Sequence, residues 1–305
     1  MTDSVFVTGA TGIVGRGVVD ALLQKGAKVI AGVRDPRSAE HLPNEVETRA
    51  FTFGASTEEL EDVLEGADRL FLMRPPQIAD VQSQLFPVID AAKRRGIRQT
   101  VFLSLQGVQQ NKSTPHYAVE EYLRLIDAPY TFLRPNFFMQ NLSTTYAAQI
   151  RERGVIYVPA GRSFTAFIDA RDIGRVAATT FTEPGHTRKA YTLSGEHSLT
   201  YRNIARTMTD VLGRHITYAR PSEKDYLAYL AAQGQPENYL AVQKMIYRIV
   251  RLNISALPNR AVRKLTGTPA TTFAEFVRDT RSVWTPSREQ RHHDSAASSD
   301  NDHNP

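Results

Sequence analysis

The chain of 305 residues contains no cysteine. This absence excludes disulfide bonds, thiolate metal ligands and cysteine nucleophiles. The sequence also lacks any apolar run near the roughly 20 residues that a membrane-spanning helix needs. It begins Met1-Thr2-Asp3-Ser4, without the basic segment of a secretory signal. We therefore expect a cytoplasmic protein that has no membrane partner.

Positive charge exceeds negative charge only moderately, with 37 Lys and Arg against 32 Asp and Glu and a formal net charge of +5. The basic residues are spread along the chain. Their densest group, Lys93-Arg94-Arg95, ends an expected helix, where cations interact favourably with the helix dipole. We therefore expect no nucleic-acid partner.

Residues 285–305 are rich in Ser, Asp, His and Asn and contain little apolar material. Such a segment cannot bury enough surface to fold, so we expect a disordered tail. Its histidines, His292, His293 and His303, could bind a metal weakly, but a solvated tail is the favoured interpretation and we expect no metal site.

The first half of the chain alternates between strand-like and helix-like segments. Short apolar runs predict strands at residues 5–8, 28–33, 46–53, 69–73, 100–105 and 130–133. Periodicity and boundary residues predict helices at 13–24, 56–64, 81–95 and 115–126. The alternation predicts an α/β fold, a Rossmann-like doubly wound parallel sheet. Such sheets bind ligands at the carboxyl ends of their strands.

The second half is less regular and predicts a smaller region of mixed α/β structure. Strands are expected at 155–158, 165–168, 191–193 and 215–218, and helices at 172–180, 201–212, 225–252 with a break near 234–236, and 273–283. We expect a Rossmann-like domain at 1–154, to which 165–181 returns, a substrate region at 155–164 and 182–284, and the tail at 285–305.

A glycine-rich turn follows the first expected strand. Its sequence, Gly9-Ala10-Thr11-Gly12-Ile13-Val14-Gly15, leads directly into a helix. Gly9 permits a sharp turn, Gly12 has no side chain to block a pyrophosphate, and Gly15 lets the helix pack close to the sheet. The helix N-terminus offers unpaired N–H groups and partial positive charge to phosphates. This context favours nucleotide binding over a simple packing turn.

The end of the second expected strand indicates which dinucleotide binds. It reads Val33-Arg34-Asp35-Pro36-Arg37, where the adenosine ribose is expected. A carboxylate there would accept a hydrogen bond from the 2′-hydroxyl of NAD, whereas a cation would pair with the 2′-phosphate of NADP. Arg34 comes first and Arg37 reinforces it, so we predict NADP, with NADPH preferred over NADH. Asp35 before Pro36 is interpreted as a turn residue.

Three separated motifs resemble those of the NmrA-like branch of the atypical short-chain dehydrogenase/reductases. They are Thr8-Gly9-Ala10-Thr11-Gly12, the stretch from Tyr130 to Asn141, and Phe167-Ile168-Asp169-Ala170-Arg171-Asp172-Ile173-Gly174. The resemblance covers residues 4 to 283 approximately. The branch includes NAD(P)H-dependent reductases of quinones, azo dyes and triphenylmethane dyes, and redox-sensing regulators that bind NADP without known turnover.

The resemblance implies cofactor contacts at the carboxyl ends of the strands. The pyrophosphate would contact Gly9, Thr11, Gly12 and Ile13 in the loop that Gly15 completes, and the 2′-phosphate would meet Arg34. The cofactor would be bordered by Arg74, Pro75 and Pro76, its nicotinamide ribose by Ser104, Leu105 and Gln106, and its nicotinamide by Asn136 and Phe138.

The chain lacks the Tyr-x-x-x-Lys pair with which catalytic short-chain dehydrogenases move a proton. Tyr117 is followed four residues later by Glu121, and Tyr122 by Ile126. We interpret both tyrosines as packing residues of their helix.

His116 takes the place where members of this branch often have a lysine, four residues before a glutamate, here Glu120. We consider that His116 hydrogen-bonds the nicotinamide ribose or donates a proton near neutral pH. The alternative is a surface histidine in the first helical turn. Asp169 and Asp172 resemble a catalytic pair, but a helix N-cap is the favoured interpretation for one or the other. Asn136 is expected to order its loop through backbone hydrogen bonds.

Without a Tyr-Lys pair, ketone reduction loses its proton relay, so we expect an acceptor that takes hydride readily. Quinones, azo compounds and cationic dyes fit, because their reduced forms stabilise charge and take protons from water. The protein would then need to stack a flat acceptor on the nicotinamide. The expected pocket residues are Phe137, Phe138 and Tyr146, with further aromatic candidates at Phe164, Phe167, Tyr226, Tyr229 and Tyr239.

The sequence therefore predicts an NADPH-dependent reductase of a small quinoid or aromatic acceptor. The alternative is a non-catalytic NADP-binding redox sensor that acts through a protein partner. A sugar-nucleotide epimerase is a weaker alternative, because epimerisation needs the missing Tyr-Lys base. A homodimer is common in this fold and stays open.

Overall fold

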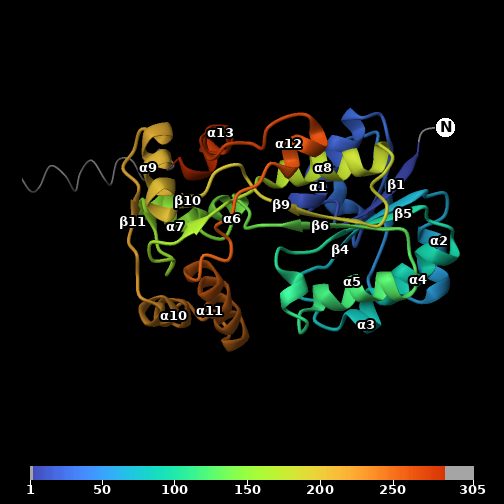
Figure 1. Ribbon diagram of the computed structural model, residues 1–305, viewed down its shortest axis with the longest axis horizontal. Coiled ribbons are helices and arrows are strands. Elements are labelled where there is room, and N and C mark those ends of the chain that lie inside the picture. Colours follow the sequence, from blue (N-terminus) through green and yellow to red (C-terminus); the bar gives the residue numbers. More distant parts are fainter. Residues whose placement is uncertain (1–2, 286–305) are drawn as a thin grey trace, which may run out of the picture. The chain divides into compact units, whose positions relative to one another are not determined.

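The computed structural model describes residues 3–285 (Figure 1). The chain folds into two compact units. Unit 1 contains the chain up to Phe138 together with Ala166–His197 and Pro258–Thr271. Unit 2 contains Met139–Thr165, Ser198–Leu257 and the chain from Thr272 onward.

A seven-stranded sheet forms the centre of unit 1. Its order is β3-β2-β1-β4-β5-β6-β9, and every neighbouring pair is parallel. The strands are β1 (Ser4–Thr8), β2 (Lys28–Val33), β3 (Glu47–Ala50), β4 (Arg69–Met73), β5 (Gln99–Leu103), β6 (Tyr130–Pro135) and β9 (Lys189–Leu193). The chain order reverses between β1 and β4, which is the point where open α/β sheets bind ligands. The α/β, doubly wound prediction is confirmed.

Helices cover both faces of this sheet (Figure 1). One face carries α1 (Ile13–Gln24), α8 (Ala170–Thr182) and α12 (Ala261–Thr266); the other carries α2 (Thr57–Val63), α3 (Val81–Gln84), α4 (Phe86–Arg94) and α5 (Pro115–Leu125). Successive side chains of a strand point to opposite faces. In β1, Val5 and Val7 therefore enter the core under α1 and α8, while Phe6 enters the core under α2 to α5.

Helices α1 and α8 pack backbone to backbone. A Cβ at Gly174 of α8 would overlap the carbonyl oxygen of Gly17 in α1, and a Cβ at Gly17 would lie 3.2 Å from the carbonyl oxygen of Ala170. Any larger residue at Gly174 would push the two helices apart. This contact holds α8 against the N-terminal half of α1, the helix that follows the glycine-rich loop.

Unit 2 is built from short strands and helices. Its strands pair as β10 (Leu199–Thr200) with β8 (Phe164–Thr165) and β11 (Thr217–Tyr218) with β7 (Val155–Ile156). Its helices are α6 (Gln140–Ser143), α7 (Ala147–Arg153), α9 (Tyr201–Leu212), α10 (Glu223–Ala232), α11 (Glu237–Arg251) and α13 (Phe273–Asp279). Trp284 is fully buried and donates its indole N–H to the carbonyl of Leu142 at 2.9 Å.

Several predicted boundaries differ from the structure. The helix expected at 81–95 is broken at Leu85, because Pro87 has no N–H to donate and its ring opposes the carbonyl of Ser83. The sixth strand, expected at 130–133, extends two residues further and ends at Pro135. The strand expected at 165–168 is limited to Phe164–Thr165, with an isolated bridge between Phe138 and Ile168.

The two units also divide the chain differently from the expected domains. Residues 139–154 belong to unit 2, because α7 packs on the Arg281–Trp284 turn. Residues 182–197 and 258–271 belong to unit 1, because β9 pairs with β6 and α12 packs on α8. Of the expected tail at 285–305, with its three histidines, only Thr285 lies within the described residues.

Candidate functional site

The glycine-rich loop turns sharply at the end of β1. Gly9 has a φ of +63°, in the left-handed region that favours glycine. The N–H of Gly12 donates to the carbonyl of Gly9 at 2.9 Å, which closes the turn. A Cβ at Gly15 would overlap this same carbonyl. The loop therefore requires glycine at both ends, as the sequence predicted for a turn that brings a helix close to a strand.

Helix α1 begins at this loop with an uncapped N-terminus. Its N-cap residue is Gly12, no side chain bonds the first N–H groups, and its first turn has no acidic residue. Thr11 is exposed and Ile13 is 47% exposed, so this helix end faces solvent. Unpaired N–H groups and the positive end of a helix dipole attract phosphate. The end of β1 therefore carries an exposed helix N-terminus with the features that suit an anion.

Arg34 lies at the end of β2 and is exposed. Its side chain has no ion-pair or hydrogen-bond partner among residues 3–285. Asp35 caps the following 3₁₀ turn: it accepts the N–H of Arg37 at 3.0 Å and pairs with its guanidinium. These bonds to Arg37 lower the pKa of Asp35. The prediction of Asp35 as a turn residue is confirmed.

The neighbouring strand ends hold two buried polar atoms without partners. Arg74, after β4, donates Nη1 to the carbonyls of Pro75 at 3.0 Å and Pro76 at 3.2 Å, but its buried Nε has no partner in the described chain. The buried Oγ of Ser104, after β5, has none either. Gln106 donates its backbone N–H to the carbonyl of Pro135 at 3.0 Å. Because buried polar groups are normally paired, these two atoms fit a polar ligand that bonds them.

His116 lies in the first turn of α5 and is half-buried. Its ring is 6.1 Å from that of Phe102. Burial, helped by the nearby charge of Arg74, lowers the pKa of His116 to about 4. The imidazole is therefore neutral near pH 7. It can accept or donate a hydrogen bond but does not carry an acidic proton.

Tyr122, one of the two candidate tyrosines of α5, is engaged with helix α4. Tyr122 stacks on Phe86 with ring centroids 3.8 Å apart, and its hydroxyl donates to Asp90 at 2.7 Å. Its packing role is confirmed. The backbone N–H of Tyr117 bonds the N-cap hydroxyl of Thr114 at 3.2 Å.

Asn136, Phe137 and Phe138 follow β6. Asn136 is buried; its N–H donates to the carbonyl of Leu193 at 2.8 Å and its Oδ1 accepts the N–H of Phe137 at 2.7 Å. Its predicted role in ordering the loop is confirmed. Phe138 packs against the core under α1 and α8.

Tyr146, the third expected pocket residue, belongs to unit 2, whereas Phe137 and Phe138 belong to unit 1. Tyr146 lines a cavity of about 290 Å³ within unit 2. The phenylalanines are not among its lining residues, so the structure does not gather the three in this cavity. The other tyrosines that line it are Tyr157, Tyr226, Tyr229 and Tyr239.

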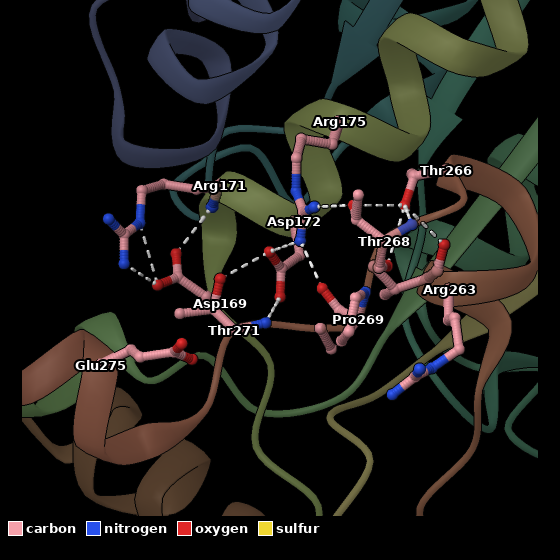
Figure 2. A network of polar contacts seen from close by, with 12 residues as sticks. Asp169, Arg171, Asp172, Arg175, Arg263, Thr266, Thr268, Pro269, Thr271 and Glu275 are labelled. Atoms are coloured by element: carbon pink, nitrogen blue, oxygen red, sulfur yellow. Dashed lines mark hydrogen bonds and ion pairs between the residues drawn. The ribbon is translucent and has the colours of Figure 1, made fainter.

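Asp169 and Asp172 each form hydrogen bonds and an ion pair with other residues of unit 1 (Figure 2). Asp169 caps α8 by accepting the N–H of Arg171 at 2.8 Å, so the N-cap prediction is confirmed for this residue. Asp172 is not a cap. It accepts the N–H and hydroxyl of Thr271 at 2.7 and 2.8 Å and pairs with Arg175. Burial raises the pKa of Asp172, against the effect of Arg175. Asp172 thus fastens the segment after α12 to α8.

One contact at the switch point was missed by sequence reasoning. The hydroxyl of Thr8 donates to the carbonyl of Phe71 at 3.1 Å and accepts the N–H of Met73 at 2.9 Å. It joins the ends of β1 and β4 beneath the glycine-rich loop. A threonine at a strand end is common, so no signal in the sequence could have identified this role.

Among residues 3–285 no group of three or more His, Asp or Glu side chains is placed to hold a metal ion. Within the same residues no helix is long and apolar enough to span a bilayer.

Known proteins resemble this chain along nearly its whole length. It is 31% identical to the NAD(P)H azoreductase of Xenophilus azovorans over 281 residues, covering 90% of this chain and 96% of the relative. The NADPH-dependent quinone oxidoreductase of Escherichia coli, solved with NADPH, matches with a TM-score of 0.80 and 28% identity, covering 90% of this chain and 98% of that one.

The triphenylmethane reductase of Citrobacter sp., solved with NADP(H), matches with a TM-score of 0.80 and 25% identity, covering 91% of this chain and 99% of that one. A model of the NmrA-like family matches residues 1–277. With the glycine-rich loop, the parallel sheet and this match in agreement, the chain belongs to the NmrA-like family.

Proposed function

We propose that the protein is an NADPH-dependent reductase that passes a hydride to a flat conjugated acceptor of the quinone, azo or triphenylmethane dye type. The observation that carries the proposal is the shared edge of four adjacent strands, β2, β1, β4 and β5. It combines an uncapped helix end, the exposed Arg34 and the buried atoms Arg74 Nε and Ser104 Oγ, which lack partners within residues 3–285. The azoreductase, quinone oxidoreductase and triphenylmethane reductase that resemble this chain support it.

The residues at this edge fit the parts of NADPH. The first N–H groups of α1 would hold the pyrophosphate, and Gly12 leaves them uncovered. Arg34 would pair with the 2′-phosphate, because Asp35 at the same strand end is already engaged by Arg37. This arrangement favours NADP over NAD.

The nicotinamide half of the cofactor would be bonded by Arg74, Ser104 and His116. Arg74 and Ser104 have buried polar atoms to offer, and a neutral His116 can bond a ribose hydroxyl. NADPH, when bound, supplies the hydride. No residue of the chain is assigned to deliver a proton: His116 is neutral near pH 7, and Tyr117 and Tyr122 have no lysine partner at the fourth following position. The reduced acceptor would take its protons from water, which suits quinones and dyes.

The test follows NADPH oxidation by the full chain with a naphthoquinone, an azo dye and a triphenylmethane dye. We expect turnover with at least one acceptor and slower turnover with NADH. Gly12→Val should abolish it, since a side chain would cover the helix end. Ser56→Val removes the N-cap of α2 instead and should leave turnover unchanged. Tight NADPH binding without turnover of any acceptor would overturn the reductase proposal and favour an NADP sensor that acts through a protein partner.

A further inference from the structure

The cavity within unit 2 is lined by residues of helices α7, α10 and α11 and of the segments beside them. Its volume is about 290 Å³. We call it the tyrosine cavity, because five tyrosines line it: Tyr146, Tyr157, Tyr226, Tyr229 and Tyr239. None of its lining residues belongs to unit 1 or to the candidate dinucleotide site.

Aromatic rings from separate segments meet in the wall of the tyrosine cavity. The ring of Tyr157 lies 5.0 Å from that of Tyr229 and 6.4 Å from that of Tyr226, tilted by 57° and 43°. Leu230 and Ala148 add apolar surface. Rings in offset or tilted contact offer faces and edges on which a flat aromatic molecule can pack.

Phenol groups in the wall have protons to donate. Within the described chain the hydroxyls of Tyr157 and Tyr239 have no hydrogen-bond partner. The hydroxyl of Tyr229 accepts from Gln149 Nε2 at 3.3 Å and keeps its own proton available. Burial raises the pKa of Tyr239. A phenol hydroxyl can donate one hydrogen bond, for which a carbonyl oxygen is a matching acceptor.

The hydroxyls of Tyr146 and Tyr226 bond to residues that do not line the cavity. The hydroxyls of Tyr146 and Tyr247 lie 2.6 Å apart, and that of Tyr226 donates to Gln243 Oε1 at 3.1 Å. These bonds fix the deep rings in place, because buried hydroxyl networks hold one geometry. The rings of Tyr146 and Tyr226 are therefore held in place before a ligand binds. Tyr157 and Tyr239 supply hydroxyl groups that have no partner within the described chain.

Charge and size restrict the ligand further. The charged lining residues are one acid and one base, Glu152 and Arg153, both exposed. The other polar lining groups are neutral, so a net charge on the ligand would find no buried counter-charge. The volume of about 290 Å³ lies just below the range of about 300–1,000 Å³ typical of small-molecule sites. One or two fused rings suit it better than a three-ring dye.

We propose that the tyrosine cavity binds a neutral, flat, two-ring aromatic molecule that carries a carbonyl group, and that it binds this molecule without a dinucleotide. A naphthoquinone belongs to this ligand class. The proposal adds a site in unit 2 and stands without the proposed reductase activity.

The test uses coumarin, an unreactive two-ring aromatic lactone, titrated by calorimetry into the full chain without dinucleotide. We expect one molecule to bind per chain. Indole, which has two rings of similar size but no carbonyl, should bind at least about tenfold more weakly. Tyr157→Phe keeps the ring and removes one donor, so it should weaken coumarin binding roughly 2- to 10-fold.

A matched pair of variants tests whether coumarin binds in the tyrosine cavity. Ala148 and Ala231 are exposed helical alanines of unit 2, but only Ala148 lines the cavity. Ala148→Trp should fill the cavity and abolish coumarin binding, whereas Ala231→Trp should leave it unchanged. Absence of coumarin binding to the unsubstituted chain, equal affinity for indole, or full affinity in Ala148→Trp would each overturn the proposal. If the chain oxidises NADPH but does not bind coumarin, the tyrosine-cavity proposal is wrong and the reductase proposal stands. If it binds coumarin but reduces no acceptor, only the reductase proposal is wrong.

Discussion

Arg134 of β6 and Glu120 of α5 form a buried two-point ion pair. Arg134 Nε donates to Glu120 Oε1 at 2.9 Å and Nη2 to Oε2 at 2.5 Å. The side chains are 8% and 1% exposed, so both charges are removed from water. Arg124 also pairs with Glu120, at 3.0 Å. The pair fixes α5, which carries His116 one turn earlier, to the strand that leads into Asn136.

Replacing Glu120 should destabilise the protein strongly. Glu120→Ala leaves the guanidinium of Arg134 buried without its counter-charge, so we expect a loss of about 3–5 kcal/mol in the free energy of unfolding. Urea denaturation measures it. The neighbouring Glu121 pairs only with Arg124 at the surface, and Glu121→Ala should cost less than about 1 kcal/mol. An equal loss in the free energy of unfolding for the two variants would show that the buried ion pair stabilises the fold no more than the surface pair does.

Replacing Arg34 should separate the two dinucleotides. Arg34→Ala removes a charged hydrogen bond to the 2′-phosphate, so NADPH affinity should fall by about 1.5–3 kcal/mol while NADH affinity stays nearly unchanged. Calorimetry with both dinucleotides measures this. Lys28 is an exposed cation at the opposite end of β2, and Lys28→Ala should change neither affinity. If Arg34→Ala weakens both dinucleotides equally, Arg34 does not meet the 2′-phosphate.

Gly12→Ala should affect binding more than folding. A Cβ at Gly12 would lie 3.2 Å from the carbonyl oxygen of Gly9, a tight contact but not an overlap, so the cost in stability should be about 1 kcal/mol at most. The methyl group would stand over the uncapped N–H groups, and we expect at least about tenfold weaker NADPH binding. Gly15→Ala is the contrasting variant, because its Cβ would overlap backbone and should destabilise the fold itself. Undiminished NADPH affinity in Gly12→Ala would place the pyrophosphate elsewhere.

His116 should make stability depend on acid pH. In the unfolded chain its imidazole takes up a proton below pH 6.5, but in the folded protein, where burial and Arg74 oppose the charge, it does so only near pH 4. Stability should therefore fall as the pH drops from 6.5 towards 4, by about 3 kcal/mol from this residue.

Unfolding free energies at pH 7 and pH 4.5 measure this effect. His116→Gln should lose less stability over that interval than the unsubstituted chain does. His197 is exposed, and His197→Gln should keep the full loss. An identical pH dependence in His116→Gln would mean that the folded imidazole titrates freely.

The sequence predicted most of the sheet and the first part of the candidate site. The bounds of α1, β2, β4 and α9 agree with the expected ranges, because each has a clear apolar period and a Gly, Pro or polar boundary. The loop from Gly9 to Gly15 was recognisable for a related reason: its positive φ and its close backbone contacts permit glycine only. The helix expected at 81–95 is interrupted at Leu85, because Pro87 removes a hydrogen bond from the turn before it.

Side-chain partners were not predictable in the same way. Arg134 was visible in the sequence only as part of a family motif, and Glu120 only as a marker for His116. That each neutralises the other depends on how α5 lies on β6. The burial that lowers the pKa of His116 likewise comes from residues on neighbouring elements, among them Phe102 and Arg74.

The amino-acid sequence alone determined the parallel sheet, the glycine-rich loop and the cation at the end of β2, because these follow from local periodicity and from backbone conformations within a few residues. Only the tertiary structure decided which charges are buried, that Gly17 and Gly174 bring α1 and α8 together, and that five tyrosines from separate segments line one cavity. Such features depend on contacts between residues far apart in the chain, and these contacts exist only once each unit has folded.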